Sequence, residues 1–598
     1  MMTGGKRGER PERAVAFVVA RLNSSRLPAK HLRRIGDKTL LGWVIANLRG
    51  CQELAEIVIA TVAESGNEPL RAYADKEGLS CYWYEGDPDQ VTTRLRRAAE
   101  EFTAEICVLV SGDCPLIHGP ALDQMIRQFR LAPQGDYISV PPDARGREPV
   151  LEGINLARRR AWQVADDLSV TPELKEHQFP VIGLHPERFQ KVAVKVPANL
   201  YGPRRRLSVD TYADLELMNT VYDTLTAQGK PFALPEVLQL LHDAPEIGQI
   251  NAHVHQRQLL ESIQRVLYVV DAGPGIGSGH LLRSRELALQ IVERLSWPVT
   301  FLVDDTAAAA LLAERGLPVA WGAWERPARP GPPGVREQTA AALLSRHDLL
   351  LLDISPRKVA SGWRQRLAAA APVIILDKSE EWTKEGDLII FPVVTAPALG
   401  QRSTNSGPAV LSGLEFAILR REIRRLMPLS RDKDLDILAY LHRPEEREAV
   451  GNFIKVHNLR GHIISGFEPD FPGLLARSRI LVSGFGISFY EALALQAYPV
   501  TWPYSPAHQQ DAQLFYARLG LPRVIIETED DLPDILPLLA GEWKGGLALR
   551  DGTPAIVQAI FSLMKQRQDY RSLSGLQDRE AAGDRDGQAA AFTGGCRQ

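Results

Sequence analysis

A short loop near the start of the chain concentrates side chains that could hold an anion. The stretch ARLNSSRLPAKHL (20–32) directly follows the apolar run AVAFVVA (14–20). Lys and Arg supply charge-assisted hydrogen bonds, and free backbone N–H groups complete a cradle for phosphate. A solvated basic loop would have the same composition, so this stretch alone leaves both interpretations open. The candidate ligands in the loop are Arg21, Ser24, Ser25, Arg26 and Lys30.

Two aspartates further along the chain could hold a metal beside that anion. Asp113 ends the run EICVLVSGD (105–113), and Asp210 ends the strand-like segment RLSVD (206–210). Mg²⁺ bound to a triphosphate needs only one or two protein carboxylates and keeps several waters. Asp113 could instead cap the helix that follows it, which is a frequent role of Asp. Two carboxylates that reach one point from different strands would suit a metal–triphosphate centre.

Two glycine-rich stretches in the second half of the chain follow strand-like runs and open helices. They are DAGPGIGSGHLLRS (271–284) and LVSGFGISFYEALALQ (481–496). Glycine lets a ligand approach the backbone and a helix N-terminus favours anions, although a structural tight turn needs the same residues. His280 at the first helix start is placed for acid–base work, and Glu491 in the second helix could accept from ribose hydroxyls. The other candidates are Gly275, Gly277, Gly279, Ser483, Gly484, Gly486 and Ser488.

Three series of apolar runs, each run followed by a helical pattern, must position these side chains. Short Val- and Ile-rich runs that alternate with helices indicate βαβ units and mainly parallel sheets. In such sheets ligands lie at the carboxyl ends of the strands, where the basic loop and Asp113 fall. The first series comprises the runs 14–20, 56–61, 105–113 and 136–141. The second comprises 266–272, 299–305, 348–354, 373–377 and 388–394, and the third 435–441, 461–467, 479–485, 498–504 and 523–528.

These series predict an α/β protein with domain boundaries near residues 260 and 405. The first domain would cover residues 14–260. Two lobes of similar size, over 265–405 and 409–545, would then face each other across a cleft. The polar ends of the chain, residues 1–13 and 566–598, are rich in Gly and charged residues, and we expect them to be disordered tails.

Composition limits the class of protein. At 598 residues and 66.2 kDa the chain is too long for one core, and a formal net charge of −3 argues against a nucleic-acid binder that works by bulk charge. The five cysteines lack pairing or metal-like spacing, which favours a reduced, cytoplasmic protein. The first dozen residues contain no apolar signal segment, and no run of about eighteen apolar residues could span a membrane.

Residues 14 to about 225 resemble the cytidylyltransferases that activate sugar acids of the acylneuraminate and 3-deoxy-octulosonate type. The resemblance is greatest to the spore-coat polysaccharide branch. It is carried by ARLNSSRLPAKHL, GDPDQVTTRLRRAAEEF, SGDCPLI, KEHQFP and RRRLSVDTYADLELM. It implies a Rossmann-type, GT-A-like nucleotide-diphospho-sugar transferase fold. It also implies that the basic loop and Arg94 bind CTP, that Asp113 binds Mg²⁺, and that Asp210 is the family's later acidic position.

The implied reaction is attack of a sugar oxygen on the α-phosphate with release of pyrophosphate, in which Arg21 and Lys30 neutralise the phosphates. Glu176, His177 and the run Arg204–Arg206 would form the acceptor pocket, although that run would also suit a solvated basic turn. The sequence departs from the family at three positions, where Ala29 replaces a glycine, Gln90 replaces an acid and Ala157 stands where an acid is expected.

Residues 265 to about 530 resemble the nucleotide-sugar hydrolase of pseudaminic acid biosynthesis and its spore-coat relatives. The carriers are VVDAGPGIGSGHLLRS, LLLLDI, VIILD, SGLEFAILRREI, VSGFGISFYEALALQAYPV and HQQDAQ. The resemblance implies a two-lobed GT-B-like fold and a UDP-sugar-like ligand. Its diphosphate would lie near residues 483–488, with His280 as the catalytic residue. The family's Gly-Gly turn is replaced here by AYLHRPEE (439–446), which contains no glycine.

Together these features predict a bifunctional cytoplasmic enzyme of surface-glycan biosynthesis, a nucleotidyltransferase fused to a nucleotide-sugar enzyme. One alternative is a glycosyltransferase whose N-terminal domain binds only a nucleotide-sugar. Another is a scaffold in which one or both sites have decayed. The identity of the sugar and the oligomeric state, a homodimer included, stay open at this stage.

Overall fold

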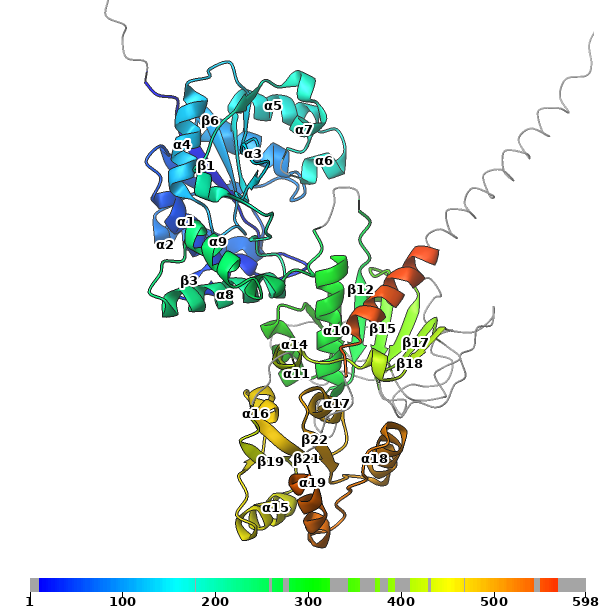
Figure 1. The fold of residues 1–598 in the computed structure, drawn as a ribbon. Helices are drawn as coiled ribbons and strands as arrows, with labels where there is room; N and C mark the ends of the chain where they lie inside the picture. Colours follow the sequence, from blue (N-terminus) through cyan, green and yellow to red (C-terminus); the bar gives the residue numbers. More distant parts are fainter. Residues whose placement is uncertain are drawn as a thin grey trace, which may run out of the picture. The chain divides into compact units, whose positions relative to one another are not determined.

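The computed structural model divides into two compact units (Figure 1). The N-terminal unit is Met1–Ile263 with Val292–Ser296 and Arg315–Leu317, and the C-terminal unit comprises Gln264–Ile291, Trp297–Glu314 and Pro318–Gln598. The structure describes residues 10–177, 179–256, 261–272, 279–322, 343–354, 371–376, 386–392, 409–427, 432–466, 468–541 and 549–567. Most of both predicted tails, together with Gly275 and Gly277, lies outside these ranges.

The N-terminal unit is built on a seven-stranded sheet whose strands run mainly parallel, as the alternation of strands and helices predicts. Its order is β10-β7-β9-β6-β1-β4-β5, and β9 alone among these strands runs antiparallel to its neighbours. The strands are β1 (Ala14–Val19), β4 (Glu56–Val62), β5 (Ser80–Tyr84), β6 (Ile106–Ser111), β7 (Tyr137–Ser139), β9 (Ile154–Arg158) and β10 (Lys191–Ala193). Two small ribbons pair β2 (Arg34–Ile35) with β3 (Lys38–Thr39) and β8 (Glu148–Pro149) with β11 (Tyr201–Gly202).

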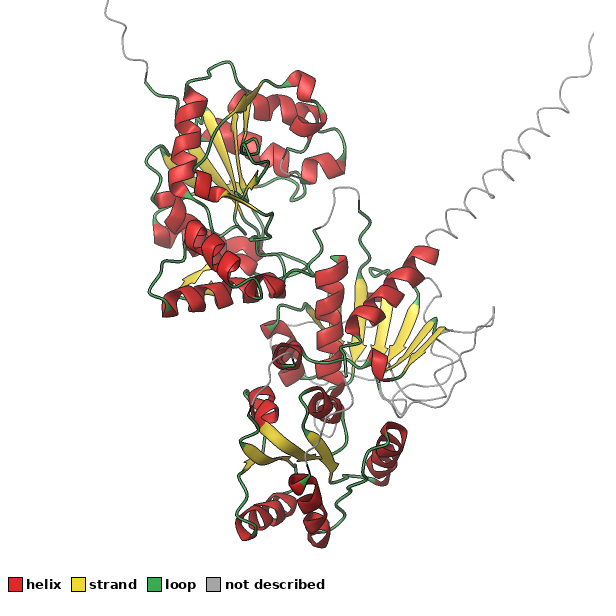
Figure 2. Ribbon diagram, in the orientation of Figure 1, coloured by secondary structure: helices red, strands yellow, loops and turns green. Residues whose placement is uncertain are grey.

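Helices cover both faces of this sheet because its central strands are apolar on both sides (Figure 2). In β1, Val18 belongs to the core under α1 (Leu40–Arg49) and α4 (Gly119–Arg130), whereas Phe17 belongs to the core under α3 (Val91–Glu101) and α5 (Arg159–Leu168). The remaining helices are α2 (Glu68–Glu77), α6 (Pro172–Glu176), α7 (Val181–Leu184), α8 (Tyr212–Ala227) and α9 (Leu234–Asp243). The carboxyl ends of the central strands therefore stay uncovered by these helices, and the side chains predicted to bind ligands lie at this edge.

The C-terminal unit contains two parallel sheets. The first sheet has the order β14-β13-β12-β15-β16-β17-β18, and all its described pairings are parallel. Its strands are β12 (Val266–Val270), β13 (Val299–Val303), β14 (Val319–Trp321), β15 (Leu349–Asp353), β16 (Val373–Leu376), β17 (Leu388–Phe391) and β18 (Ala409–Ser412). Helices α10 (Gly279–Leu295) and α11 (Thr306–Glu314) follow β12 and β13. Because β18 begins at residue 409, the boundary predicted at 405–409 is wrong and falls after residue 412.

The second sheet is smaller and has the order β20-β19-β21-β22, again parallel. Its strands are β19 (Leu435–Tyr440), β20 (Gly461–Ile464), β21 (Ser478–Ser483) and β22 (Tyr498–Thr501). Around it lie α14 (Arg421–Leu426), α15 (Pro444–Val456), α16 (Phe471–Arg477), α17 (Ile487–Ala494), α18 (Pro506–Leu519) and α19 (Leu536–Ala540). The strand predicted over 523–528 is wrong, since this segment makes only a single bridge between Ile525 and Thr501.

Both ends of the described chain extend beyond the predicted domain limits. Residues 553–567 form a helix that returns to the first sheet, where Arg567 pairs with Asp387. At the other end Glu12 pairs with Arg158 at 2.8 Å, so contacts begin before the predicted start at residue 14. Among the helices that the structure describes, none combines the length and the apolarity needed to cross a membrane.

Candidate nucleotide-binding sites

Lys30, Asp113 and Asp210, which we call the carboxylate centre, meet at the carboxyl edge of the N-terminal sheet. Lys30 Nζ lies 2.5 Å from Asp113 Oδ2 and 2.8 Å from Asp210 Oδ1. Asp113 follows the end of β6, and Asp210 precedes α8. The predicted convergence of the two carboxylates is therefore confirmed. The strand predicted over 206–210 is wrong: this segment is held instead by a hydrogen bond from Val209 N–H to the Asp113 carbonyl, 2.8 Å long.

The carboxylate centre is part of a charge-balanced network. Arg26 lies 3.0 Å from Asp210 Oδ1, and Arg206 bonds to the other oxygen at 2.8 Å and to Asp214 at 2.9 Å. Burial alone would lower the pKa of Lys30, but the charges of Asp113 and Asp210 outweigh it and raise that pKa. Burial likewise opposes ionisation of Asp210, yet Lys30, Arg26 and Arg206 hold its pKa well below the ordinary value. Lys30 and Asp210 are thus both ionised at neutral pH.

The basic loop is closed by its own hydrogen bonds. Ala29 N–H donates to the Leu22 carbonyl at 3.0 Å, and Leu27 N–H donates to Ser24 Oγ at 3.3 Å. Ser25 is exposed. Ala29 adopts φ 53° and ψ 29°, the left-handed conformation that glycine would adopt without strain. A residue with a Cβ is destabilised by about 1–2 kcal/mol in this conformation. The fold therefore accepts Ala29 in place of the family's glycine, at the cost of local backbone strain.

The geometry of the carboxylate centre depends on a close approach between the ends of two neighbouring strands, β1 and β6. A methyl group on Gly112 would come within 2.7 Å of the Val19 carbonyl and 3.0 Å of the His31 ring. His31 is buried beside Lys30, and burial followed by the Lys30 charge lowers its pKa to about 4, so its ring is neutral. Ser111 donates to Asp113 Oδ1 at 2.7 Å. Sequence reasoning missed His31 and Ser111, although both are neighbours of predicted ligands in the chain.

The residues predicted to bind the acceptor are dispersed. Arg206 contacts Asp210 of the carboxylate centre, whereas Arg205 donates to the Leu241 carbonyl at 3.3 Å, so these two neighbours have different partners. The predicted acceptor role of Arg204–Arg206 stays a prediction. Glu176 ends α6 and His177 follows it. In the described residues, no hydrogen bond or ion pair joins Glu176 or His177 to the carboxylate centre. Their role as acceptor ligands stays a prediction.

The donor set of the carboxylate centre suits one kind of metal site. Asp113 and Asp210 supply the carboxylate oxygens that Mg²⁺ prefers, and a cation, the Lys30 ammonium, already bridges them. Within the described part of the chain, no group of three or more His, Cys, Asp or Glu side chains could hold a metal. The residues therefore fit Mg²⁺ that arrives with a polyphosphate and takes most of its ligands from phosphate and water.

His280, Arg283 and Asp353, which we call the histidine centre, lie at the carboxyl edge of the first sheet of the C-terminal unit. His280 is in the first turn of α10, and its Nδ1 lies 2.6 Å from Asp353 Oδ1. Arg283 Nε and Ser284 Oγ donate to Asp353 Oδ2 at 2.7 and 2.8 Å. The His280 side chain is 34% exposed, whereas that of Asp353 is fully buried. Despite burial, the charges of Arg283 and His280 lower the pKa of Asp353, so a permanent carboxylate orients an accessible imidazole.

The glycine-rich turn of the second sheet is more closed than the sequence suggests. Gly484 N–H donates to the Tyr504 hydroxyl at 3.3 Å, and a methyl group on Gly484 would lie 2.0 Å from the Tyr504 ring. Ser483 is buried and its Oγ donates to the Gly484 carbonyl at 3.1 Å. Beside Gly486 the space is open, since an added methyl would meet no atom within 4 Å. Only Gly486 and the partly exposed Ser488 therefore keep the predicted accessibility.

Two further predictions for the C-terminal unit have different outcomes. Glu491 is fully buried and both its oxygens bond to Arg420 at 2.5 Å, so the assignment of Glu491 to a ribose is wrong for this structure. Gly279 is the first residue of α10, directly before His280, as predicted.

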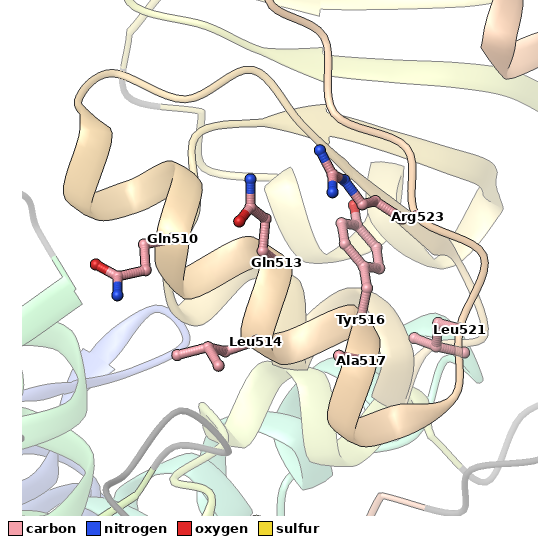
Figure 3. Close-up of a pocket in the computed structure, with 7 residues that line it drawn as sticks. All are labelled: Gln510, Gln513, Leu514, Tyr516, Ala517, Leu521 and Arg523. Carbon is pink, nitrogen blue, oxygen red and sulfur yellow. The ribbon is translucent and has the colours of Figure 1, made fainter.

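A shallow hollow also lies on one side of α18 (Figure 3). Its wall is formed by that helix and the segment after it, and Arg523 is its one charged residue. It includes part of HQQDAQ, one of the stretches with family resemblance. The lining residues are Gln510, Gln513, Leu514, Tyr516, Ala517, Leu521 and Arg523.

The sheet order and the cationic, carboxylate-bearing edge of the N-terminal unit define an α/β domain of the nucleotide-diphospho-sugar transferase kind. Residues 15–222 match the model of the cytidylyltransferase family, so this unit carries a cytidylyltransferase region. The chain is 25% identical over 238 residues to the spore coat polysaccharide biosynthesis protein SpsF of Bacillus subtilis, covering 39% of this chain and 95% of SpsF. It is 25% identical over 126 residues to the 3-deoxy-manno-octulosonate cytidylyltransferase of Bdellovibrio bacteriovorus, covering 21% of this chain and 49% of that protein.

A solved cytidylyltransferase structure from Leptospira borgpetersenii also aligns with the chain. The two sequences are 22% identical, the TM-score is 0.35, and the alignment covers 41% of this chain and all of that one. The sequence prediction of a cytidylyltransferase region is therefore confirmed for the N-terminal unit by the family match. The predicted hydrolase resemblance of the C-terminal unit stays a prediction.

Proposed function

We propose that the N-terminal unit transfers a cytidylyl group from CTP to a sugar acid or a related sugar and releases pyrophosphate. The observation that carries this proposal is the meeting of Asp113 and Asp210 beside Lys30 at the edge of a region that matches the cytidylyltransferase family. Relatives named for spore-coat polysaccharide biosynthesis and for 3-deoxy-manno-octulosonate support a substrate of the sugar-acid class and a place in surface-glycan biosynthesis.

In this proposal the chain's residues bind and orient the substrates. Asp113 and Asp210 would hold Mg²⁺, which supplies charge stabilisation at the reacting phosphate. Lys30 and Arg26 would exchange their carboxylate partners for phosphate oxygens when the nucleotide enters, because both already contact Asp210, one of the carboxylates that would hold the cation. Arg206 keeps Asp210 and Asp214 in position. Phosphoryl transfer needs little covalent chemistry from the protein, so positioning and charge are its main contributions.

The test is a turnover assay with each nucleoside triphosphate, Mg²⁺ and a panel of sugar acids that includes 3-deoxy-manno-octulosonate. We expect pyrophosphate release and a product mass equal to the sugar plus CMP, with CTP favoured. Pyrophosphate release with none of the triphosphates would contradict the proposal. Nucleotide-dependent thermal stabilisation without turnover would favour the alternative in which this site has decayed into a binding module.

We further propose that the C-terminal unit is a GT-B-like module that acts on a UDP-sugar-like ligand as a hydrolase or glycosyltransferase. The observation in favour is the histidine centre, in which buried Asp353 holds Nδ1 of the exposed His280. A carboxylate in this position fixes the tautomer and leaves Nε2 free to take a proton from water or a sugar hydroxyl. The closed turn at Gly484 and the burial of Glu491 favour the alternative of a decayed site.

The two outcomes for this module are separable by experiment. The full chain is incubated with UDP-sugars, with and without an acceptor sugar. The quantity measured is the release of UDP or of a sugar phosphate. Release without an acceptor indicates a hydrolase, and release only with an acceptor indicates a glycosyltransferase. Binding of no UDP-sugar in calorimetry would contradict the proposed ligand class.

A further inference from the structure

Asn67, between β4 and α2, joins the basic loop to the end of a neighbouring strand. Its Oδ1 accepts from Leu22 N–H at 2.9 Å, and its Nδ2 donates to the Val62 carbonyl at 3.2 Å. The two bonds fix the orientation of the amide, because the reversed amide would place its NH₂ group against the Leu22 N–H. Asn67 is 1% exposed, so solvent does not compete for these bonds. The side chain therefore links the loop to the carboxyl end of β4.

Asn67 occupies the position from which an asparagine usually caps a helix. It directly precedes α2, and Asn is a preferred N-cap residue because its oxygen accepts from N–H groups of the first turn. Here the Asn67 side chain makes no hydrogen bond to α2. Its oxygen bonds to Leu22 instead, so stabilisation of the helix does not explain this asparagine.

The basic loop depends on this contact because few other bonds define its shape. Residues 21–26 form no helix or strand. The Leu22 carbonyl accepts from Ser24 N–H and from Ala29 N–H, both at 3.0 Å, so the loop closes on itself at Leu22. Among the hydrogen bonds of the described residues, only the bond to Asn67 runs from a backbone N–H of residues 21–26 to a residue outside the loop. Asn67 thus holds the loop at its point of closure.

We propose that Asn67 is a positioning residue that keeps the basic loop in the shape that binds phosphate groups. Its side chain is buried between Leu22 and Val62, so it acts through the loop and not by contact with a substrate. Ordering a loop during binding opposes affinity, so a loop that is already held binds an anion more tightly. This role rests on the proposed cytidylyltransferase function of the N-terminal unit.

The experiment compares Asn67→Ala with a matched control, Asn219→Ala, in the full chain. Asn219 also holds a turn through both ends of its amide, since it accepts from Gly36 N–H at 3.2 Å and donates to the Arg34 carbonyl at 3.3 Å. That turn joins β2 to β3 and contains no residue of the carboxylate centre. Three quantities are measured: deuterium exchange of the peptides that contain the basic loop and α2, calorimetric affinity for pyrophosphate and CTP, and turnover. Thermal melting is recorded for both variants.

Asn67→Ala should increase deuterium exchange in the loop peptide and leave that of the α2 peptide as in wild type, since α2 loses no cap. Affinity for pyrophosphate and CTP should fall by about threefold to tenfold, which corresponds to the loss of one neutral hydrogen bond. KM for CTP should rise by a similar factor, and kcat should change less than KM. Asn219→Ala should lower the melting temperature by a similar amount without any of these changes.

A second variant, Asn67→Asp, keeps the oxygen that accepts from Leu22 N–H and loses the donor to the Val62 carbonyl. Its loop peptide should exchange faster than that of wild type and more slowly than that of Asn67→Ala. If Asn67→Ala does not fold, this increase over wild type carries the test. The added negative charge affects anion binding directly, so only exchange is compared for this variant.

Three results would overturn the positioning role. The first is unchanged exchange of the loop peptide, and the second is increased exchange with unchanged affinity for pyrophosphate and CTP. The third is a wild type that binds neither of these probes. Failure of the proposed function is distinct, because it is read from product formation, whereas the role of Asn67 is read from loop exchange and anion affinity.

Discussion

The carboxylate centre and the histidine centre occupy matching places in two different sheets. Each lies at the carboxyl end of a strand that pairs with the first strand of its unit: β6 beside β1 for Asp113, and β15 beside β12 for Asp353. In both, a cationic side chain contacts the aspartate. Asp113 and Asp353 therefore have the same location in the topology of their sheets. The chemistry that each site can perform depends on the side chains around its aspartate.

The difference between the two aspartates is access. The side chains of Asp113 and Asp210 are 18% and 15% exposed and share one ammonium, so incoming phosphate and metal can replace that ammonium. Asp353 is fully buried, and His280, Arg283 and Ser284 use both its oxygens. The first arrangement suits binding of charged substrates, whereas the second can only orient the histidine in front of it.

Removing the carboxylate should have the largest effect in the N-terminal unit. Asp113→Asn removes charge with little change of volume, and we expect Mg²⁺-dependent pyrophosphate release to fall by about a hundredfold or more. Circular dichroism and the melting temperature should stay close to wild type. Asp167→Asn, an exposed change on α5, serves as the control. Full retained activity of Asp113→Asn would show that Asp113 is only a helix cap.

In the histidine centre, removing the accessible imidazole of His280 should lower the reaction rate but leave ligand binding nearly unchanged. His280→Ala should lower turnover of the C-terminal unit by about 10²–10⁴-fold, because a general acid or base contributes that much. UDP and UDP-sugar affinities should change little, and His462→Ala, an exposed change on β20, is the matched control. Binding that collapses together with turnover would contradict the assigned role.

Acid should destabilise both centres with the same sign. The pKa values of Asp210 and Asp353 are lower in the folded protein than the ordinary value of about 3.9. Their stabilisation is therefore fully present above that value and is lost as the pH falls below it, at about 2–3 kcal/mol for a strongly paired aspartate. Urea unfolding between pH 7 and pH 3 measures the first part of this loss, which continues as the pH falls toward the folded-state pKa values. Asp210→Asn and Asp353→Asn should each show a smaller decrease, and stability that rises in acid would refute the assignment.

The smallest expected effect concerns the basic loop of the N-terminal unit. Ala29→Gly should stabilise the N-terminal unit by up to about 1 kcal/mol, because the strain at φ 53° is relieved while the unfolded chain gains some freedom. The reverse change Gly78→Ala, at φ 64° with no atom within 4 Å of the new methyl, should destabilise by a similar amount. Chemical denaturation measures the free energy of unfolding of both variants. An Ala29→Gly protein that is less stable than wild type would contradict the claim that Ala29 is strained.

Sequence patterns predicted the central strands well because these strands are buried on both faces. The runs VLYVV in β12 and LLLLD in β15 are continuous and apolar, which makes them visible without any partner. The pattern missed β5, β9 and β14, which are short, of mixed composition, or antiparallel. Strand-like composition misled at 206–210 and 523–528, since pairing depends on neighbours that a single segment does not reveal.

For the sites, too, the sequence revealed local features but not the contacts made by tertiary packing. Spacing and residue type identified Lys30, Asp113 and His280, each next to a strand end or a helix start. They could not identify the partners that lie further along the chain, such as Asp353 on His280 or Tyr504 over Gly484. The burial of Glu491 under Arg420 is likewise a property of tertiary packing, so a carboxylate one turn into a helix looked accessible when it is not.

The return of the chain after the second sheet makes that sheet an insertion within the C-terminal unit. The chain leaves the first sheet after β18 and comes back at Gly552, whose N–H donates to the Ala417 carbonyl at 2.8 Å. A methyl group on Gly552 would lie 2.3 Å from the Glu415 carbonyl and 2.4 Å from the Phe416 Cα, so the outgoing and returning segments touch. The second sheet is therefore joined to the first through two chain segments that touch each other. A chain cut at residue 545 would lose one of these two segments, together with the helix over 553–567, whose Phe561 ring contacts Trp297.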